Sequence, residues 1–189
     1  VPAGDLRRKV LPDYTIGCKR VLISNAWYPA LQRPNVTLIT DGIAKIEGNA
    51  IVSTDGTRRE VDVLILGTGF YATENPISSS IRGRDGLLLS EAWKDGEEAY
   101  LGTLVKDFPN FFFIVGPNTG LGHSSMIYMI EAQVAYIQSL FRHMASSSAT
   151  TLEVSPVVQD AYNHELQKKL KGSIWATGCK SWYQHRSGK

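Results

Sequence analysis

The sequence has no long hydrophobic run, and its positive and negative charges almost balance. No stretch approaches the roughly 18 consecutive apolar residues that a membrane span needs, and the first residues lack the apolar core of a secretory signal. Lys and Arg total 20 against 18 Asp and Glu, mixed along the chain, so no basic stripe indicates nucleic acid. We therefore predict a cytoplasmic protein with no membrane span and no nucleic-acid partner.

Cysteine is also scarce, and the common catalytic motifs are missing. The two cysteines, Cys18 and Cys179, lie far apart with no partner motif, which excludes a zinc cluster built on cysteine and favours two reduced thiols. The patterns HExxH, Walker A, CxxC and GxSxG do not occur. We expect no metal site, and none of these motifs identifies the chemistry.

What is present is an ordinary globular composition, 43% hydrophobic and 20% charged, with length for one domain or a little more. The chain opens in a charged stretch and stops in SWYQHRSGK, just after an aromatic cluster, with no closing element behind it. We therefore expect a chain truncated at both ends.

Residues 61–72, VDVLILGTGFYA, fit the Gly-x-Gly-x-x-Gly/Ala pattern of a dinucleotide site. The aliphatic run 61–66 predicts a strand covered on both faces. A phosphate cradle also needs a helix that begins on the glycines, because phosphate binds the free N–H groups of a helix start. Residues 73–76, TENP, show no helical periodicity and include a proline. We interpret the stretch as a strand ending in glycines, not as a phosphate cradle.

Short β-like runs alternate with turn residues before that strand. The runs lie at 36–39, 43–46 and 51–52, and the steps Asp41-Gly42, Gly48-Asn49 and Asp55-Gly56 accept the positive φ of tight hairpin turns. This pattern predicts a small antiparallel meander. Residues 74–107 follow as a long excursion rich in Ser, Gly and charge, of a kind that is often functional.

The order strand, glycine loop and helix is complete between residues 111 and 144. Residues 111–115 predict a second buried strand, and Ser124 and Ser125 are good N-caps for a helix. A helix start offers N–H donors and a positive dipole end to an anionic or carbonyl-rich ligand, although the residues alone equally allow a plain turn and cap. The apolar residues expected on one face of this helix are Ile127, Ile130, Val134, Ile137 and Phe141.

A second helix is predicted over 156–171, with Pro156 in its first turn and Gly172 at its end. Its expected inward face carries Val157, Ala161, His164 and Leu166 or Leu170. Near the start of the chain, Lys19-Arg20 places two cations after Gly17, a fair place to hold phosphate or a developing anion, although most such pairs are solvated surface.

Four segments together resemble one family: DYTIGCKR, VDVLILGTGF, FPNFFFIVGPNTGLGHSSMIYMIEAQ and a late SWY. They resemble the C-terminal part of the flavin-dependent Baeyer–Villiger monooxygenases and their flavin-containing monooxygenase relatives, in order and spacing from Asp13 to Tyr183. The resemblance implies an enzyme that uses FAD and NADPH to insert one oxygen atom from O2 into a ketone or onto a heteroatom, through a peroxyflavin intermediate.

The resemblance also implies a fold. It is a mixed α/β fold, the C-terminal part of a Rossmann-like FAD/NAD(P)-binding architecture, with the small antiparallel meander and two C-terminal helices. Residues 1–34 would leave the NADP-binding domain as a linker, and residues 35–189 would belong to the FAD-binding domain.

Individual roles follow from the resemblance in the same way. Arg20 would be the catalytic arginine that stabilises the negatively charged peroxyflavin, and Lys19 would lie near the NADPH 2′-phosphate. Met126 would start the helix whose N–H reaches the flavin. The other cofactor-binding residues would be Gly67, Thr68, Gly69, Gly116, Asn118, Ser125 and Trp182, and the substrate pocket would be lined by Leu121, Gly122 and His123.

The two Gly-x-Gly-x-x-Gly fingerprints of such enzymes do not occur in this chain. We therefore expect a missing N-terminal part to carry them, and we expect residues 1–189 alone to be inactive and to bind FAD weakly or not at all. Two alternatives stay open. One is a pyridine-nucleotide-dependent flavoprotein reductase, which usually has an acidic residue where Pro117 and Asn118 stand, and the other is a non-catalytic interaction module.

Overall fold

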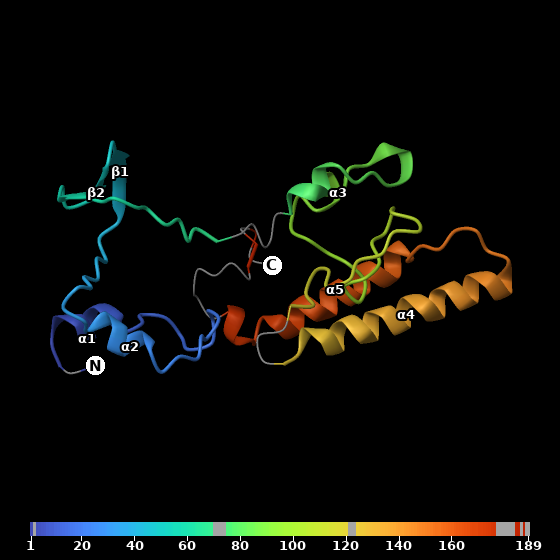
Figure 1. Cartoon of the computed structure of the whole chain (residues 1–189). Helices are drawn as coiled ribbons and strands as arrows, with labels where there is room; N and C mark the ends of the chain where they lie inside the picture. Colours follow the sequence, from blue (N-terminus) through green and yellow to red (C-terminus); the bar gives the residue numbers. More distant parts are fainter. Residues whose placement is uncertain (2, 70–74, 121–123, 177–183, 186, 188–189) are drawn as a thin grey trace. The chain divides into compact units, whose positions relative to one another are not determined.

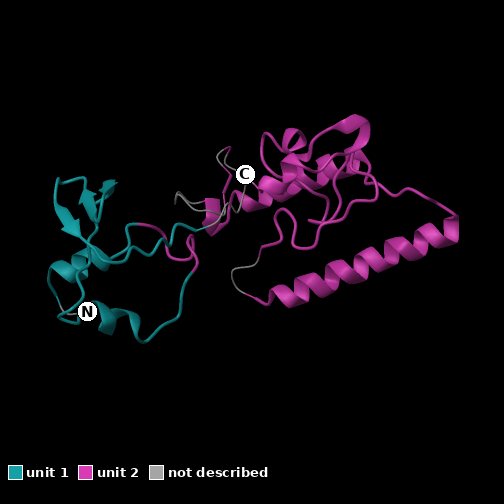
Figure 2. Ribbon diagram, turned by 45° about the horizontal axis from the view of Figure 1, so that its top comes forward, with its two compact units in different colours: residues 1–13, 21–70 teal, residues 14–20, 71–189 magenta. Residues whose placement is uncertain are grey.

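The computed structural model describes the chain except residues 2, 70–74, 121–123, 177–183, 186 and 188–189 (Figure 1). Contacts divide it into two compact units, residues 1–13 with 21–70 (unit 1) and residues 14–20 with 71–189 (unit 2), coloured separately in Figure 2. The elements confirm a mixed α/β chain with a small antiparallel sheet and two long C-terminal helices. In order they are α1 (Asp5–Val10), α2 (Trp27–Leu31), β1 (Ile43–Glu47), β2 (Ala50–Ser53), β3 (Arg58–Glu60), η1 (Pro76–Ser79), η2 (Arg84–Gly86), α3 (Leu89–Ala92), α4 (Met126–Ser147), α5 (Pro156–Leu170) and η3 (Ile174–Ala176).

The sheet of unit 1 is the predicted meander, with the order β1-β2-β3 and both pairs antiparallel. Gly48 and Gly56 take φ of 57° and 83° at the two turns, as their dipeptides predict. Ala50 and Ser53 of β2 are its buried residues, because β2 is the central strand. The run 36–39 forms no strand, and the third strand is β3, which is not among the predicted runs.

The prediction of a buried strand at 61–66 is wrong for this structure. After Val61, whose N–H donates to the Asn49 carbonyl at 2.8 Å, the run is extended but pairs with no described segment. Val63, Ile65 and Leu66 are 71–87% exposed. An aliphatic run becomes a buried strand only when neighbouring strands and covering layers are supplied, and unit 1 supplies neither. The run 21–23 is exposed in the same way.

The core of unit 2 is built on aromatic rings held by loops. Leu89, Trp93, Ala99, Val105 and Phe108 are buried together, with half-buried Phe111 and Phe113 packed against them. Phe113 stacks on Trp93 at 5.3 Å and meets Phe111 edge-on at 4.8 Å. The predicted strand 111–115 is therefore also wrong: Phe112 makes one isolated bridge to Leu104, and Val115 leaves the extended region at φ 57°.

Both long helices begin where their capping residues predict, but only part of each predicted face is covered: Ile130 and Ile137 on α4, and Leu166 and Leu170 on α5, are half-buried. α4 follows Ser125, and α5 starts with Pro156 and ends at Leu170. On α5 Val157 is 77% exposed and His164 is exposed, and on α4 Ile127 and Phe141 are exposed. The fully buried positions are amides instead: Gln133 on α4, and Gln159 and Asn163 on α5.

The reason is that these helices pack against irregular backbone, whose N–H and C=O groups need polar partners. Gln159 accepts the Lys106 N–H at 2.8 Å, and Gln133 bonds to the backbone of residues 102 and 115. None of the helices in the described part of the chain combines the length and apolarity that a bilayer crossing requires.

Candidate functional site

The loop that carries Lys19 and Arg20 belongs to unit 2, although the chain on either side of it belongs to unit 1. Gly17 takes φ 91°, and a Cβ there would lie 3.1 Å from Ile174 Cδ1 of η3, so the glycine lets the loop pack on the C-terminal turn. Cys18 beside it is fully buried and disulfide-bonded, which corrects the prediction of a reduced thiol at this position. The loop is therefore anchored on the side of Gly17 and Cys18.

The two cations after this anchor point outward. Lys19 Nζ lies 4.5 Å from the centroid of the Tyr14 ring, a cation–π contact within the same loop. The Arg20 side chain is exposed, and its guanidinium forms no ion pair with any residue that the structure describes. A permanently charged guanidinium without a carboxylate partner favours an anion beside it.

A second group of predicted site residues lies in the loop before α4. Gly116 is half-buried and packs against the Gly102 backbone, while Asn118 is exposed at φ 62°. Thr119 is buried and its hydroxyl donates to the Gly116 carbonyl at 2.6 Å, which closes the turn. The loop is thus a rigid turn that presents Asn118 to solvent.

The start of α4 is positioned as the sequence predicts. Ser125 is the N-cap, yet its hydroxyl makes no capping hydrogen bond, and Met126 opens a helix of 22 residues. The aligned peptide dipoles of such a helix place partial positive charge at its first turn. Leu121, Gly122 and His123, predicted for the substrate pocket, and Trp182, predicted for the cofactor, lie outside the described residues.

The predicted cofactor segment Gly67-Thr68-Gly69 belongs to unit 1. All three residues are exposed, and a Cβ on Gly67 or Gly69 would meet no atom of the described residues within 4 Å. Gly69 takes φ 84°, which favours glycine. These glycines therefore leave their backbone accessible to a group that is not part of unit 1.

The structure thus brings six predicted site residues into one unit: Lys19, Arg20, Gly116, Asn118, Ser125 and Met126. The sequence prediction missed Gln133, a buried polar residue two turns into α4 that bonds to the loop carrying Gly116. Its signal in the sequence is weak, because a single glutamine on a helix is usually a solvated surface residue. Among the described residues, no group of three or more His, Cys, Asp or Glu side chains is placed to hold a metal ion.

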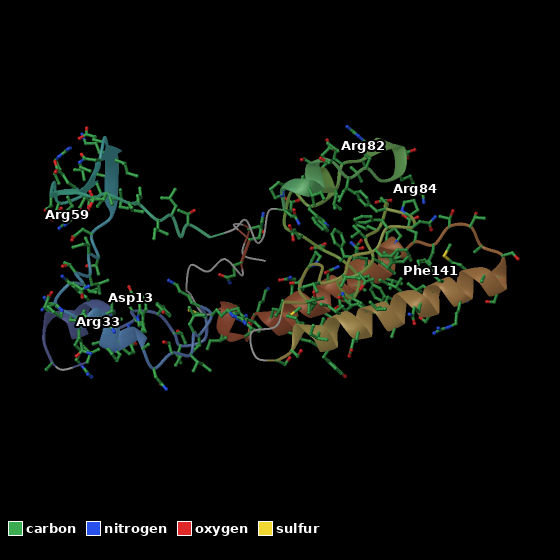
Figure 3. All side chains as sticks on the ribbon, viewed as in Figure 1. Asp13, Arg33, Arg59, Arg82, Arg84 and Phe141 are labelled. Carbon is green, nitrogen blue, oxygen red and sulfur yellow. The ribbon has the colours of Figure 1, made fainter. Side chains whose placement is uncertain are left out.

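Aromatic and ionic contacts hold α4 and α5 to the loops of unit 2. Phe141 of α4, labelled in Figure 3, meets Phe112 edge-on at 5.4 Å, and Tyr162 of α5 meets Tyr100 in the same way at 5.2 Å. Burial raises the pKa of Tyr162, with a further contribution from the charge of Tyr100. The Arg84 side chain, also labelled in Figure 3, forms an ion pair with Glu153 ahead of α5.

The sequence and the fold of this chain were compared with those of known proteins. No protein-family model matches the chain. It is 52% identical over 182 residues to a Baeyer–Villiger monooxygenase of Pseudomonas aeruginosa, an alignment that covers 96% of this chain and 34% of that protein. It is 45% identical over 186 residues to a Baeyer–Villiger monooxygenase of Streptomyces coelicolor, with 97% of this chain and 36% of that protein covered. Its fold matches the crystal structure of OTEMO in complex with FAD and NADP with a TM-score of 0.85 and 26% identity, over 96% of this chain and 35% of that one.

The predicted resemblance to Baeyer–Villiger monooxygenases is confirmed by sequence and by fold. The chain spans about a third of the length of the relatives that it matches.

Proposed function

We propose, from its similarity along nearly its whole length to Baeyer–Villiger monooxygenases, that this chain is the part of such an enzyme that holds the catalytic arginine and a flavin-facing helix. The complete enzyme uses FAD and NADPH to insert one oxygen atom from O2 into a ketone or onto a heteroatom. The sequence similarity carries the proposal, and the fold match to a protein that binds FAD and NADP supports it.

Bound FAD, once reduced by NADPH, supplies the oxygen-activating chemistry. The residues of this chain fit such a group. Arg20 is exposed and without an ion pair in the described chain, so its guanidinium can hold negative charge that develops beside the flavin without giving up a proton. Lys19, in the same anchored loop, offers a compact cation to the NADPH 2′-phosphate.

The start of α4 and the exposed glycines have different proposed roles in binding the flavin. The first turn of α4, at Ser125 and Met126, would offer the positive end of the helix dipole to negative charge on a bound flavin. Gly67-Thr68-Gly69 is exposed and leaves its backbone open for close approach, whereas in the turn Gly116–Asn118 only Asn118 is exposed. Leu121, Gly122 and His123 remain the proposed substrate pocket and Trp182 a proposed cofactor contact.

The exposed apolar runs support a larger fold. We assign residues 1–34 to a linker that leaves an NADP-binding domain and residues 35–189 to a Rossmann-like FAD-binding domain. In that fold the runs 21–23 and 63–66 pair with strands outside this chain, since their aliphatic side chains are now exposed to water. A cytoplasmic location stays a sequence-based prediction.

The direct test of the reaction is oxygen transfer by the full-length protein. Purified protein loaded with FAD is incubated with NADPH, a ketone and isotopically labelled O2, and the ester product is analysed by mass spectrometry. We expect one labelled oxygen atom per ester molecule. A flavoprotein reductase would consume NADPH without labelled product, and an interaction module would not consume NADPH.

A further inference from the structure

Gln133 stands out because it is the buried residue of a helix whose aliphatic residues are partly exposed. Its side chain is 4% exposed and bonds in both directions. Oε1 accepts the Val115 N–H at 2.8 Å, while Nε2 donates to the Gly102 carbonyl at 3.1 Å and to Thr103 Oγ1 at 3.0 Å, with the Leu101 carbonyl at 3.4 Å. One amide therefore ties α4 to two separate points of the preceding chain, residues 101–103 and residue 115.

Both loops hold an apolar residue in the left-handed region at the point where Gln133 binds. Val115 has φ 57° and Leu101 has φ 52°. Positive φ is unfavourable for residues with a Cβ, most of all for a β-branched residue such as valine. Such conformations persist only where the surroundings fix them, and they gather at functional sites. Gln133 bonds to the N–H of one strained residue and to the carbonyl of the other.

The two loops also interlock through their glycines. A Cβ on Gly116 would lie 2.3 Å from the Gly102 carbonyl oxygen, and a Cβ on Gly102 would lie 2.0 Å from Thr119 Cγ2 and 3.1 Å from the Pro117 carbonyl oxygen. The contacts are too close for the loops to slide past one another. Gln133 and this interlock together form one clasp, made of residues 101–103, 115–119 and 133.

We propose that Gln133 is a positioning residue for the flavin, which acts by fixing the turn Gly116–Asn118 relative to the start of α4. The inference rests on the proposed function. The segment 115–120 and the helix start at Ser125 and Met126 carry the proposed flavin contacts, and both are held by the same helix. Met126 opens this helix, and the segment 115–120 is bonded through the Val115 N–H to Gln133, seven residues further on, about 10 Å along the axis.

A glutamine is required because the clasp needs an acceptor and a donor on one side chain. Leucine would leave the Val115 N–H and the Gly102 carbonyl without their partner, and glutamate would lose the donor. Without the clasp the segment 115–120 is released at Val115, so the turn no longer holds Gly116 and Asn118 in place. Loss of Gln133 therefore changes the surroundings of the flavin and not only the stability of the fold.

The test compares Gln133→Leu with Gln159→Leu in the full-length protein. Gln159 is an equally buried glutamine, on α5, which accepts the Lys106 N–H at 2.8 Å and lies outside the clasp. For Gln133→Leu we expect FAD to bind about tenfold more weakly, as expected for the loss of one or two buried hydrogen bonds. We also expect a changed absorption spectrum of the remaining bound flavin. Gln159→Leu lowers the melting temperature to a similar degree but leaves the flavin spectrum and affinity unchanged.

Two further measurements keep the inference testable if Gln133→Leu fails to fold. Thr103→Val removes the hydroxyl that accepts from Gln133, whereas Thr103→Ser keeps it; we expect the first to weaken FAD binding and the second to restore it. Amide hydrogen exchange without FAD reports on the clasp itself, and we expect faster exchange at Val115 in Thr103→Val than in Thr103→Ser.

Equal flavin affinities and spectra in Gln133→Leu and Gln159→Leu overturn the inference, as do equal affinities in the two Thr103 variants. Failure of the unaltered protein to bind FAD contradicts the proposed function instead. In that case faster exchange at Val115 would still show that the clasp exists, and the role assigned to it would be wrong.

Discussion

Gly116 and Gly102 approach so closely that a Cβ on Gly116 would lie 2.3 Å from the Gly102 carbonyl oxygen. The obstacle is backbone, which cannot rotate away as a flexible side chain can. This contact holds the turn before α4 against the turn at residues 101–103, and it explains why glycine stands at this point of the loop.

Substitution Gly116→Ala is expected to destabilise the fold by about 3 kcal/mol, at the upper end of the usual effect of overpacking. The matched control is Gly120→Ala in the same loop, where a Cβ would lie within 4 Å of no atom in the part of the chain that the structure describes. We expect that change to stay within about 0.5 kcal/mol. Urea unfolding followed by circular dichroism measures both, and equal stabilities would show that the two loops do not interlock.

Glu153 contributes to stability through the backbone more than through its ion pair. One carboxylate oxygen accepts the Asp107 N–H at 2.6 Å, at a residue with φ 68°, and the other pairs with Arg84. Glu153→Ala leaves that half-buried N–H without its acceptor, so we expect a loss of about 2 kcal/mol.

The surface ion pair between Lys106 and Asp160, with N···O of 2.5 Å, is the comparison. Asp160→Ala removes only a solvent-exposed charge, so we expect less than about 1 kcal/mol, and less again in high salt. Urea unfolding at low and high salt separates the two variants. If Glu153→Ala lowered the free energy of unfolding as little as Asp160→Ala does, and if that loss depended on salt, Glu153 would not act mainly through the backbone.

Tyr162 on α5 makes stability depend on pH in the alkaline range. Its pKa is raised above the usual value of 10.0, chiefly by burial and further by the charge of Tyr100. The unfolded chain therefore loses this proton at lower pH than the folded chain does, so stability is fully present below pH 10 and falls as pH rises through the folded value. Tyr162→Phe removes this proton, and we expect base-induced unfolding, followed by circular dichroism, to shift to higher pH. An unchanged midpoint would show that Tyr162 is not coupled to unfolding.

The helix starts were predictable from sequence because their signals are local. Ser125 before Met126 and Pro156 in a first turn set the backbone within a few residues of themselves. The glycine turns of the meander were predictable for the same reason, since Gly48 and Gly56 supply the positive φ that those turns need.

The absence of strands at 61–66 and 111–115 could not be predicted in this way. An aliphatic or aromatic run indicates only that a segment will be buried against other parts of the protein. Whether the segment forms a strand depends on whether a neighbouring strand is available to pair with it. Residues 63–66 have no partner strand in unit 1, and the rings of Phe111 and Phe113 fill the core from an irregular segment.

The candidate site was predictable only in part. The resemblance pointed to Arg20 and to the start of α4, but Gln133 gave only a weak signal because its partners lie at residues 101–103 and 115. The tertiary structure decides which face of a helix packs against loop backbone, and the sequence of the helix alone does not show it. The disulfide bond of Cys18 also depends on the tertiary structure, because no cysteine motif surrounds this residue in the sequence.

The central claim, that this chain supplies the catalytic arginine of a flavin monooxygenase, is tested most directly by Arg20→Ala in the full-length protein. Arg33→Ala, at an exposed arginine of unit 1 labelled in Figure 3, is the matched control. We expect Arg20→Ala to lower product formation at least about 100-fold, as expected when a group that stabilises developing charge is removed. The bound flavin, measured by its absorbance, should stay unchanged, and Arg33→Ala should match the unaltered protein. Product formation by Arg20→Ala at the rate of the Arg33→Ala control would contradict the account.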